Sequence, residues 1–346
     1  MKVNMADNSH VDLGFVEKTD TGKLLCQYFP SKVGGKPAWL SLSPLPSPNQ
    51  ILCSKCNSLC VFLLQVYAPI EDDDNSFHRT IFVFLCKNAN CHQPNSSVPF
   101  MVLRSQLPRV NDFYSPDPPT PVTPVPDKGD KLCVVCGISG PKCCSKCHSR
   151  SYCSKEHQVI DWKKGHKQNC DECKEDRTTN SSEQVLFQEY ELLIEGEEFQ
   201  KEEEKSEPEK KEELHSFLKS EKASSLLQDC SSEELERMSN QSEDKVFLKF
   251  RKRMNHAPEQ VLRYDRGGSP LLVSSDNKPD QIPNCDCGAK RQFEFQVMPQ
   301  LLCHLGMDQV GDSIDWGTLC VYTCSANCYH GNQYQQEYLW KQDYSK

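Results

Sequence analysis

The sequence predicts an α+β protein that is mainly β, in which two duplicated β-rich units flank a small cysteine-rich insertion and a disordered acidic linker. Three observations lead to this prediction. The two ends of the chain repeat the same motifs in the same order, the middle contains closely spaced cysteines and histidines, and one stretch concentrates the negative charge. Because only 37% of the 346 residues are hydrophobic, a single large core is not expected.

The N-terminal unit, residues 1–115, contains a Gly-Gly-x-Pro turn, cysteine pairs and the apolar runs "FLLQVYAP" and "TIFVFLC". These runs are rich in β-branched and aromatic residues and too short for helices, so they predict strands. The C-terminal unit, residues 246–346, repeats the turn, the cysteine pair and the runs "FEFQVMP" and "TLCVYTC" in the same order.

The spacing within the two ends also matches. Cys56 precedes Gln65 by nine residues, and Cys287 precedes Gln296 by nine. Five elements in one order with matched spacing indicate two copies of one unit.

Two linkers separate these units from the insertion at residues 131–173. Residues 116–130 include six prolines in eleven positions, which predicts an extended, semi-rigid spacer. Residues 174–245 are rich in Glu, Lys and Ser and predict an acidic, low-complexity linker. "SSEQVLFQEYELLIE" within it and "SSEELERMSNQSEDKVFLKFRKR" across its end are typical of short capped helices.

The formal charge of −9 is concentrated in one place. Seventeen acidic and six basic residues between Asp171 and His215 give that stretch a net charge of −11. No long basic face remains elsewhere, so binding to nucleic acid through its phosphates is not expected. The run Lys249–Arg253 fits a nuclear address or, more simply, the solvated face of a helix.

The chain shows no apolar stretch of the ~18 to 20 residues that a membrane helix needs, and its start lacks the apolar centre of a signal peptide. We therefore expect an intracellular protein. In a reducing compartment, twenty-one cysteines at paired spacings favour metal ligation over disulfides.

Eight residues of the insertion have metal-ligand spacing. A two-residue gap lets a turn direct both sulfurs at one ion, and a three-residue gap places both ligands on one face of a helix. About forty residues cannot bury a sufficient core, so metal must supply the folding energy. The eight ligands are Cys133, Cys136, Cys144, Cys147, Cys153, His157, His166 and Cys170.

This spacing resembles the MYND zinc finger. The resemblance implies two Zn²⁺ ions in a cross-brace, with Cys143 and Cys173 as extra thiols. It also implies binding of proline-containing peptides or corepressors through Ser145, Gln158 and Trp162. The alternative for Trp162 is a packing anchor of the finger. The two ligand sets are Cys133, Cys136, Cys153 and His157, and Cys144, Cys147, His166 and Cys170.

Each β-rich unit has a further set of four cysteines that fits one more Zn²⁺, as in a zinc ribbon; the alternative is reduced core thiols. The sets are Cys53, Cys56, Cys86 and Cys91, and Cys285, Cys287, Cys324 and Cys328. Cysteines without a partner at ligand spacing are Cys26, Cys60, Cys230, Cys303 and Cys320.

Together, "GGKPAWL", "FLLQVYAP", "CSKEHQVIDWKKGHKQNC", "FEFQVMPQLL" and "SIDWGTL" resemble the programmed cell death protein 2 family. The resemblance implies a cytoplasmic and nuclear factor that acts as a dedicated chaperone for a newly made small-subunit ribosomal protein of the S-five family. The acidic linker is then either a shield for a basic client or a solvated tether, and the paired β units a groove for a client segment.

A MYND finger is also compatible with two other classes of function. A nuclear adaptor that recruits transcriptional corepressors through the finger, and so influences apoptosis or proliferation, needs a promoter-tethering module that the sequence does not show. MYND fingers also occur in lysine methyltransferases, but no cofactor motif, nucleotide loop or catalytic Ser/His/Asp set is recognisable here, so no enzyme activity is expected. Because no long apolar stretch is present, no direct membrane contact is expected either.

Overall fold

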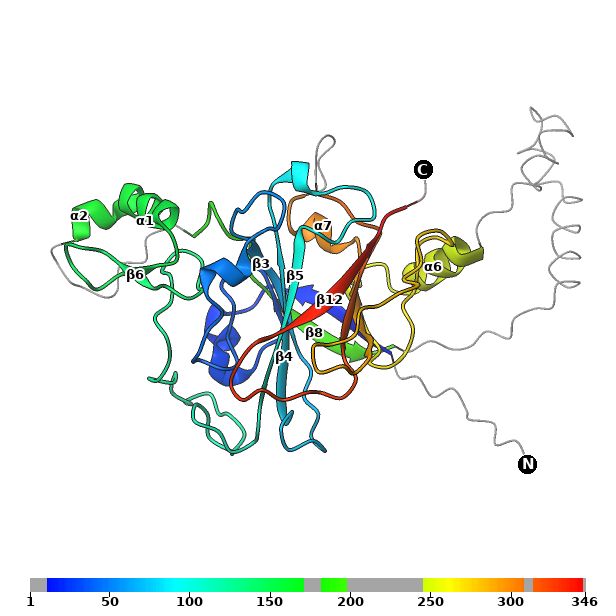
Figure 1. Ribbon diagram of the computed structural model, residues 1–346, viewed down its shortest axis with the longest axis horizontal. Coiled ribbons are helices and arrows are strands. Elements are labelled where there is room, and N and C mark those ends of the chain that lie inside the picture. Colours follow the sequence, from blue (N-terminus) through cyan, green and yellow to red (C-terminus); the bar gives the residue numbers. More distant parts are fainter. Residues whose placement is uncertain (1–10, 171–181, 198–244, 308–313, 345–346) are drawn as a thin grey trace, which may run out of the picture.

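Ten strands close one antiparallel barrel in the computed structural model, which describes residues 11–170, 182–197, 245–307 and 314–344 (Figure 1). The strand order is β1-β8-β2-β3-β4-β5-β12-β11-β10-β9, and β1 pairs with both β8 and β9. The barrel strands are β1 (Asp12–Glu17), β2 (Lys32–Val33), β3 (Val61–Tyr67), β4 (His78–Leu85), β5 (Phe100–Leu107), β8 (Tyr190–Gly196), β9 (Leu262–Tyr264), β10 (Arg291–Val297), β11 (Thr318–Cys324) and β12 (Gln335–Gln342).

Helices are few and short among the described residues, and the protein is mainly β. In the described part of the chain, no helix combines the length and apolarity needed to cross a bilayer. The finger lies on one side of the barrel and α6 on the opposite side (Figure 1). The remaining elements are η1 (Thr21–Leu24), η2 (Cys26–Tyr28), η3 (Pro48–Ile51), η4 (Ala89–Cys91), β6 (Lys142–Cys143), β7 (Ser151–Tyr152), α1 (Lys155–Asp161), η5 (Trp162–His166), α2 (Lys167–Asn169), α6 (Lys245–His256) and α7 (Leu301–His304).

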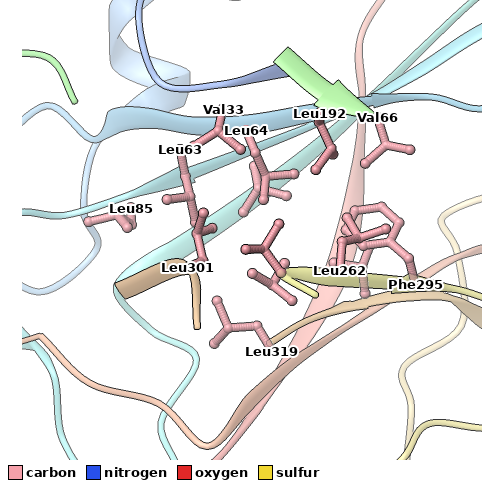
Figure 2. Packing of buried hydrophobic residues seen from close by; sticks show 14 of the residues in the cluster. Val33, Leu63, Leu64, Val66, Leu85, Leu192, Leu262, Phe295, Leu301 and Leu319 are labelled. Carbon is pink, nitrogen blue, oxygen red and sulfur yellow. The ribbon is translucent and has the colours of Figure 1, made fainter. Parts of the chain in front are cut away.

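The interior of the barrel is filled with apolar side chains from both β-rich units and from β8. Val33, Leu64 and Leu192 meet Leu262 and Phe295 there, each of them less than one-tenth exposed (Figure 2). The two units therefore share one hydrophobic core, and the expectation that no single large core forms is wrong. The expected groove for a client segment stays a prediction, because this core fills only the inside of the barrel.

The duplication is visible in the strands. β2, β3, β4 and β5 are followed along the barrel by β12, β11, β10 and β9, which repeat them in reverse order. A β-bulge lies between Phe62 and Leu64 in one copy and between Phe293 and Phe295 in the other. An irregularity at the same position of both copies supports two copies of one unit.

One glutamine in each copy makes the same contacts. The Gln65 side chain accepts from the Ala38 backbone N at 2.9 Å and donates to its carbonyl at 3.1 Å. The Gln296 side chain does the same with Leu271, at 2.6 and 2.9 Å. Ala38 and Leu271 each follow the proline of a Gly-Gly-x-Pro turn, so both glutamines anchor the turn that the sequence repeats.

The acidic linker is not wholly a linker. The expectation of a helix over residues 181–195 is wrong, because Tyr190–Gly196 form strand β8 between β1 and β2. The helix-forming Glu and Leu residues yield to the pairing offered by two neighbouring strands, with Tyr190 and Leu192 buried on alternate positions. Residues 198–244 of the predicted linker lie outside the described residues.

Candidate metal centres

Four groups of cysteine and histidine side chains converge in the described residues. In each group the four ligand atoms lie within 4.8 Å of one another. The groups are Cys133, Cys136, Cys153 and His157; Cys144, Cys147, His166 and Cys170; Cys53, Cys56, Cys86 and Cys91; and Cys285, Cys287, Cys324 and Cys328. These are the four sets that the sequence predicts.

The distances inside the groups fit a tetrahedral metal site. The sulfurs of Cys136 and Cys153 are 3.6 Å apart, and the Cys147 Sγ is 3.6 Å from the His166 Nε2. Zinc–sulfur bonds of about 2.3 Å place two tetrahedral ligands about 3.8 Å apart, whereas a disulfide needs about 2.05 Å. Four nitrogen and sulfur donors at this separation fit Zn²⁺, and each group is complete without a water ligand.

The finger holds its ligands on turns and helix ends. Gly137, which follows the first cysteine pair, has φ +75°, and a Cβ there would lie 2.6 Å from the Cβ of Lys36. The expectation that Cys153 shares a helix with His157 is wrong, because Cys153 precedes Ser154, the N-cap of α1. His166 ends η5 and Cys170 is the C-cap of α2. The pair His166 and Cys170 therefore lies on helical turns, as predicted.

The selection of Cys144 over Cys143 agrees with the structure. Cys144 is buried, with its sulfur 3.7 Å from that of Cys170. Cys143 is exposed and lies 3.9 Å from His148 Nδ1, outside the group. Cys173 lies outside the described residues.

The outer groups occupy the same place in the two copies. In each, the first two cysteines precede the strand β3 or β10, and the last two lie at or after the end of β4 or β11. The sulfurs of Cys56 and Cys86 are 3.6 Å apart, as are those of Cys285 and Cys328. The C-terminal group is the more open one, since Cys287 is exposed.

Some thiols in the groups are poised as thiolates, the form that binds metal. Hydrogen bonds from the Ser58 side chain and backbone lower the pKa of Cys56 to about 6. Burial raises the pKa of Cys147, but hydrogen bonds from Ser149 outweigh it and bring the pKa to about 7.

The two histidines differ in their surroundings. Burial and the charge of Arg150 lower the pKa of His166, which favours the neutral imidazole that a metal requires. Burial opposes protonation of His157, but hydrogen bonds with Cys133 and Cys153 raise its pKa to about 9. Metal binding at that group therefore displaces a proton.

Cysteines outside the groups behave as core or surface residues. Burial raises the pKa of Cys320 and that of Cys60 to about 12, which keeps both thiols protonated and unreactive. Cys26 is half-buried and Cys303 exposed, and neither belongs to a group. Cys230 lies outside the described residues.

A tryptophan of the N-terminal unit docks the finger, and the sequence analysis did not single it out. The Trp39 Nε1 donates to the Gly137 carbonyl at 2.7 Å, and its ring packs on Phe82 and Phe84 of β4. One buried cluster joins this face of the barrel to the finger cysteines. The only signal was its position in "GGKPAWL", after the first Gly-Gly-x-Pro turn.

The three residues expected to bind peptides lie on the finger with different exposures. Ser145 is exposed, and Gln158 is half-buried on α1. Trp162 is also half-buried, and its ring meets the edge of His166 at a centroid distance of 5.6 Å. Trp162 thus contributes to packing and still presents surface.

A cleft of about 730 Å³ lies where the N-terminal unit, the proline-rich linker and the start of the finger meet. Its lining includes three of the exposed large apolar residues, Leu25, Val125 and Leu132, at 41%, 58% and 44% exposure. An apolar lining open to solvent is suited to a partner chain.

A buried ion pair crosses the barrel interior. The Arg79 guanidinium on β4 donates to both carboxylate oxygens of Glu294 on β10 at 2.7 and 2.8 Å, and both side chains are fully buried. Tyr264 donates to the same carboxylate at 2.8 Å. Burial opposes ionisation of Glu294, but Arg79 holds the pKa of this carboxyl below its usual value.

Comparison with known proteins gives family matches to three parts of the chain. The family models for the N-terminal domain of programmed cell death protein 2, the MYND finger and the C-terminal putative domain of programmed cell death protein 2 match residues 10–121, 133–170 and 244–343. No solved structure gives a significant match.

Individual relatives are similar over nearly the whole chain. Programmed cell death protein 2 of Bos taurus is 43% identical, and that of Mus musculus 42%, each covering 96% of both chains. A more distant relative, the probable 20S rRNA accumulation protein 4 of Schizosaccharomyces pombe, is 26% identical over 86% of this chain and 87% of its own length.

Proposed function

The chain belongs to the programmed cell death protein 2 family, and on that premise we propose that it is a zinc-binding chaperone for a newly made small-subunit ribosomal protein of the S-five family. The observation that carries the proposal is the match along most of the chain to a relative named for rRNA accumulation, which supports a role in ribosome production. The chain acts in the cytoplasm and nucleus, without an enzymatic step.

The metal centres support an interaction protein rather than a catalyst. Each group offers four protein ligands, and catalytic zinc sites keep one position for water or substrate. The Zn²⁺ ions serve as structural elements, two in the finger and one in each β-rich unit. Elemental analysis of the purified protein is expected to give four zinc ions per chain, and a value of two would remove the outer sites.

Client binding is assigned to the cleft and to the acidic segment. The cleft provides apolar contacts through Leu25 and its neighbours. Residues 198–244 carry fifteen acidic and seven basic residues, a net charge of −8 that suits a basic ribosomal protein. Since residues 190–196 form a barrel strand, a segment that includes them cannot serve as a removable shield.

The test is a pull-down from cell extract at low salt with identification by mass spectrometry. A single stoichiometric ribosomal protein is the expected result. Leu25→Lys is expected to weaken its capture, whereas Val98→Lys, at an apolar residue of 49% exposure outside the cleft, should leave it unchanged. Replacing residues 199–243 with a neutral linker of equal length reports on the acidic segment.

The finger offers a second candidate function, recruitment of corepressors, because Trp162 presents part of its surface. Trp162→Ala separates the two. Loss of corepressors with this variant, in the absence of any ribosomal client, would show an adaptor and refute the chaperone.

A further inference from the structure

The two β-rich units meet along β1 and β9 and again along β5 and β12, and we call the second contact the seam. β5 and β12 are joined by three residue pairs, Gln335 with Arg104, Gln336 with Leu103 and Glu337 with Val102. Within the N-terminal unit, β4 and β5 pair over their whole length, from His78 to Leu85. Because few backbone pairs join the two strands, side-chain contacts must contribute much of the stability of the seam.

Arg104 reaches from the N-terminal unit to the metal group of the C-terminal unit. Its Nε donates to Glu337 at 2.7 Å. Its Nη atoms donate to the Cys328 carbonyl at 3.2 and 3.3 Å, and Nη2 lies 3.4 Å from the Cys328 sulfur. Arg104 is 1% exposed, so its charge depends on these partners.

Glu337 extends the same network into the group. It accepts from Arg291 at 2.9 Å and from the Cys324 backbone N at 3.1 Å. Cys324 and Cys328 are two of the four ligands, so β5 and β12 together hold the loop that carries them.

Lys341 makes the reciprocal contact. Lys341 pairs with Leu319 on β11, and Arg104 pairs with Ile81 on β4. Lys341 and Arg104 therefore occupy equivalent positions in the two copies. Its Nζ lies 3.4 Å from the Gln93 carbonyl, two residues after Cys91 of the N-terminal group. Lys341 is 4% exposed.

The loop after Cys91 is tied to β12 by two more bonds. The Asn95 backbone N donates to the Asp343 carboxylate at 2.6 Å, and the Asp343 backbone N donates to the Asn95 side chain at 2.8 Å. Asp343 also pairs with Lys341 at 2.7 Å. Each metal-binding loop is thus braced by the last strand of the other unit.

We propose that Arg104 and Lys341 are reciprocal positioning residues, each holding the metal-binding loop of the opposite unit, so that metal at each outer group also closes the barrel seam. The donor sets of both groups fit Zn²⁺, as shown above. A bound ion fixes the loop, and the fixed loop presents the carbonyls that the buried cations need. Because coupling is reciprocal, a closed seam also raises the metal affinity.

The test is cysteine alkylation by N-ethylmaleimide in the zinc-loaded full chain, resolved by peptide mass spectrometry. Outer-sphere partners of this kind change metal affinity by about 10- to 100-fold. Arg104→Met is expected to speed alkylation of the C-terminal group about that much and the N-terminal group far less. Lys341→Met is expected to do the opposite.

Lys55→Met is the matched control. Lys55 donates to the Asn90 carbonyl in the same loop as Gln93, but it is exposed and belongs to the N-terminal unit itself. We expect alkylation of both groups to stay within about twofold of the wild type, because an exposed lysine holds its partner weakly. Arg104→Lys, which keeps the charge without the planar fork, should lie between wild type and Arg104→Met.

The crossed pattern decides the outcome. Equal acceleration at both groups in both variants would mean that the residues act through global stability alone and would overturn the proposal, as would no acceleration. If the variants do not fold, zinc removal from the wild-type chain by a chelator replaces them. Hydrogen exchange should then rise at the seam residues Leu103 and Gln336 before it rises in β3 and β4, and a seam that stays protected would refute the coupling.

Discussion

The finger and the barrel are built on different sources of stability. The finger, residues 131–170, has two strands of two residues each and short helices around two ligand groups. The barrel has a large apolar core and fully buried ion pairs, with its two ligand groups at the strand ends. Metal binding is the main source of stability for the finger, and apolar packing is the main source for the barrel. Loss of one ligand group should therefore destabilise the finger more than the barrel.

Cys133→Ser should give the largest difference between the two regions. Structural zinc contributes on the order of 10 kcal/mol to folding, and the finger has little else to replace it. We expect the finger to unfold and at least one zinc ion to be lost, while the thermal transition of the barrel remains. Circular dichroism melting and zinc content measure this.

Cys143→Ser is the matched control for that variant, because Cys143 is the exposed neighbour of a ligand and belongs to no group. It should behave as the wild type. Loss of all folded signal in Cys133→Ser would contradict the view that the finger is an insertion.

Arg79→Met tests the barrel in the same way. It removes the bidentate partner of the buried Glu294 carboxylate and leaves only Arg266, 3.4 Å away, as a cation among the described residues; breaking a buried ion pair typically costs about 3–5 kcal/mol. We expect the free energy of unfolding of the barrel in urea to fall by that amount, with the zinc content of the finger unchanged. The double variant with Glu294→Met should recover much of the loss.

Arg109→Met provides the control for Arg79→Met, since Arg109 is exposed and should change stability by less than about 0.5 kcal/mol. If Arg79→Met were equally mild, the ion pair would not be a determinant of barrel stability.

Trp39→Phe addresses the junction and should have the smallest effect. The ring is largely kept, but the Gly137 carbonyl loses its donor, which costs about 1–3 kcal/mol when the group stays buried. We expect faster hydrogen exchange around Gly137 and unchanged protection in β3 and β4. An equal loss of protection in both regions would mean that the finger and the barrel are one cooperative unit.

The sequence by itself determined the parts whose chemistry is local. Closely spaced cysteine pairs can direct both sulfurs at one ion, so spacing indicated the candidate ligands. The choice of Cys144 over Cys143 and the division of the finger ligands into two groups came from the resemblance to the MYND finger. The apolar runs determined the strands, and their repetition determined the duplication.

The tertiary structure alone decided how these parts combine. Pairing between distant strands depends on which strand edges remain unpaired after each unit forms, and local composition does not predict this. Residues 190–196 therefore became β8 despite helix-forming residues, and the two units closed one barrel. Arg104 and Lys341 each contact the metal-binding loop of the other unit only because closure of the barrel brings the two units together.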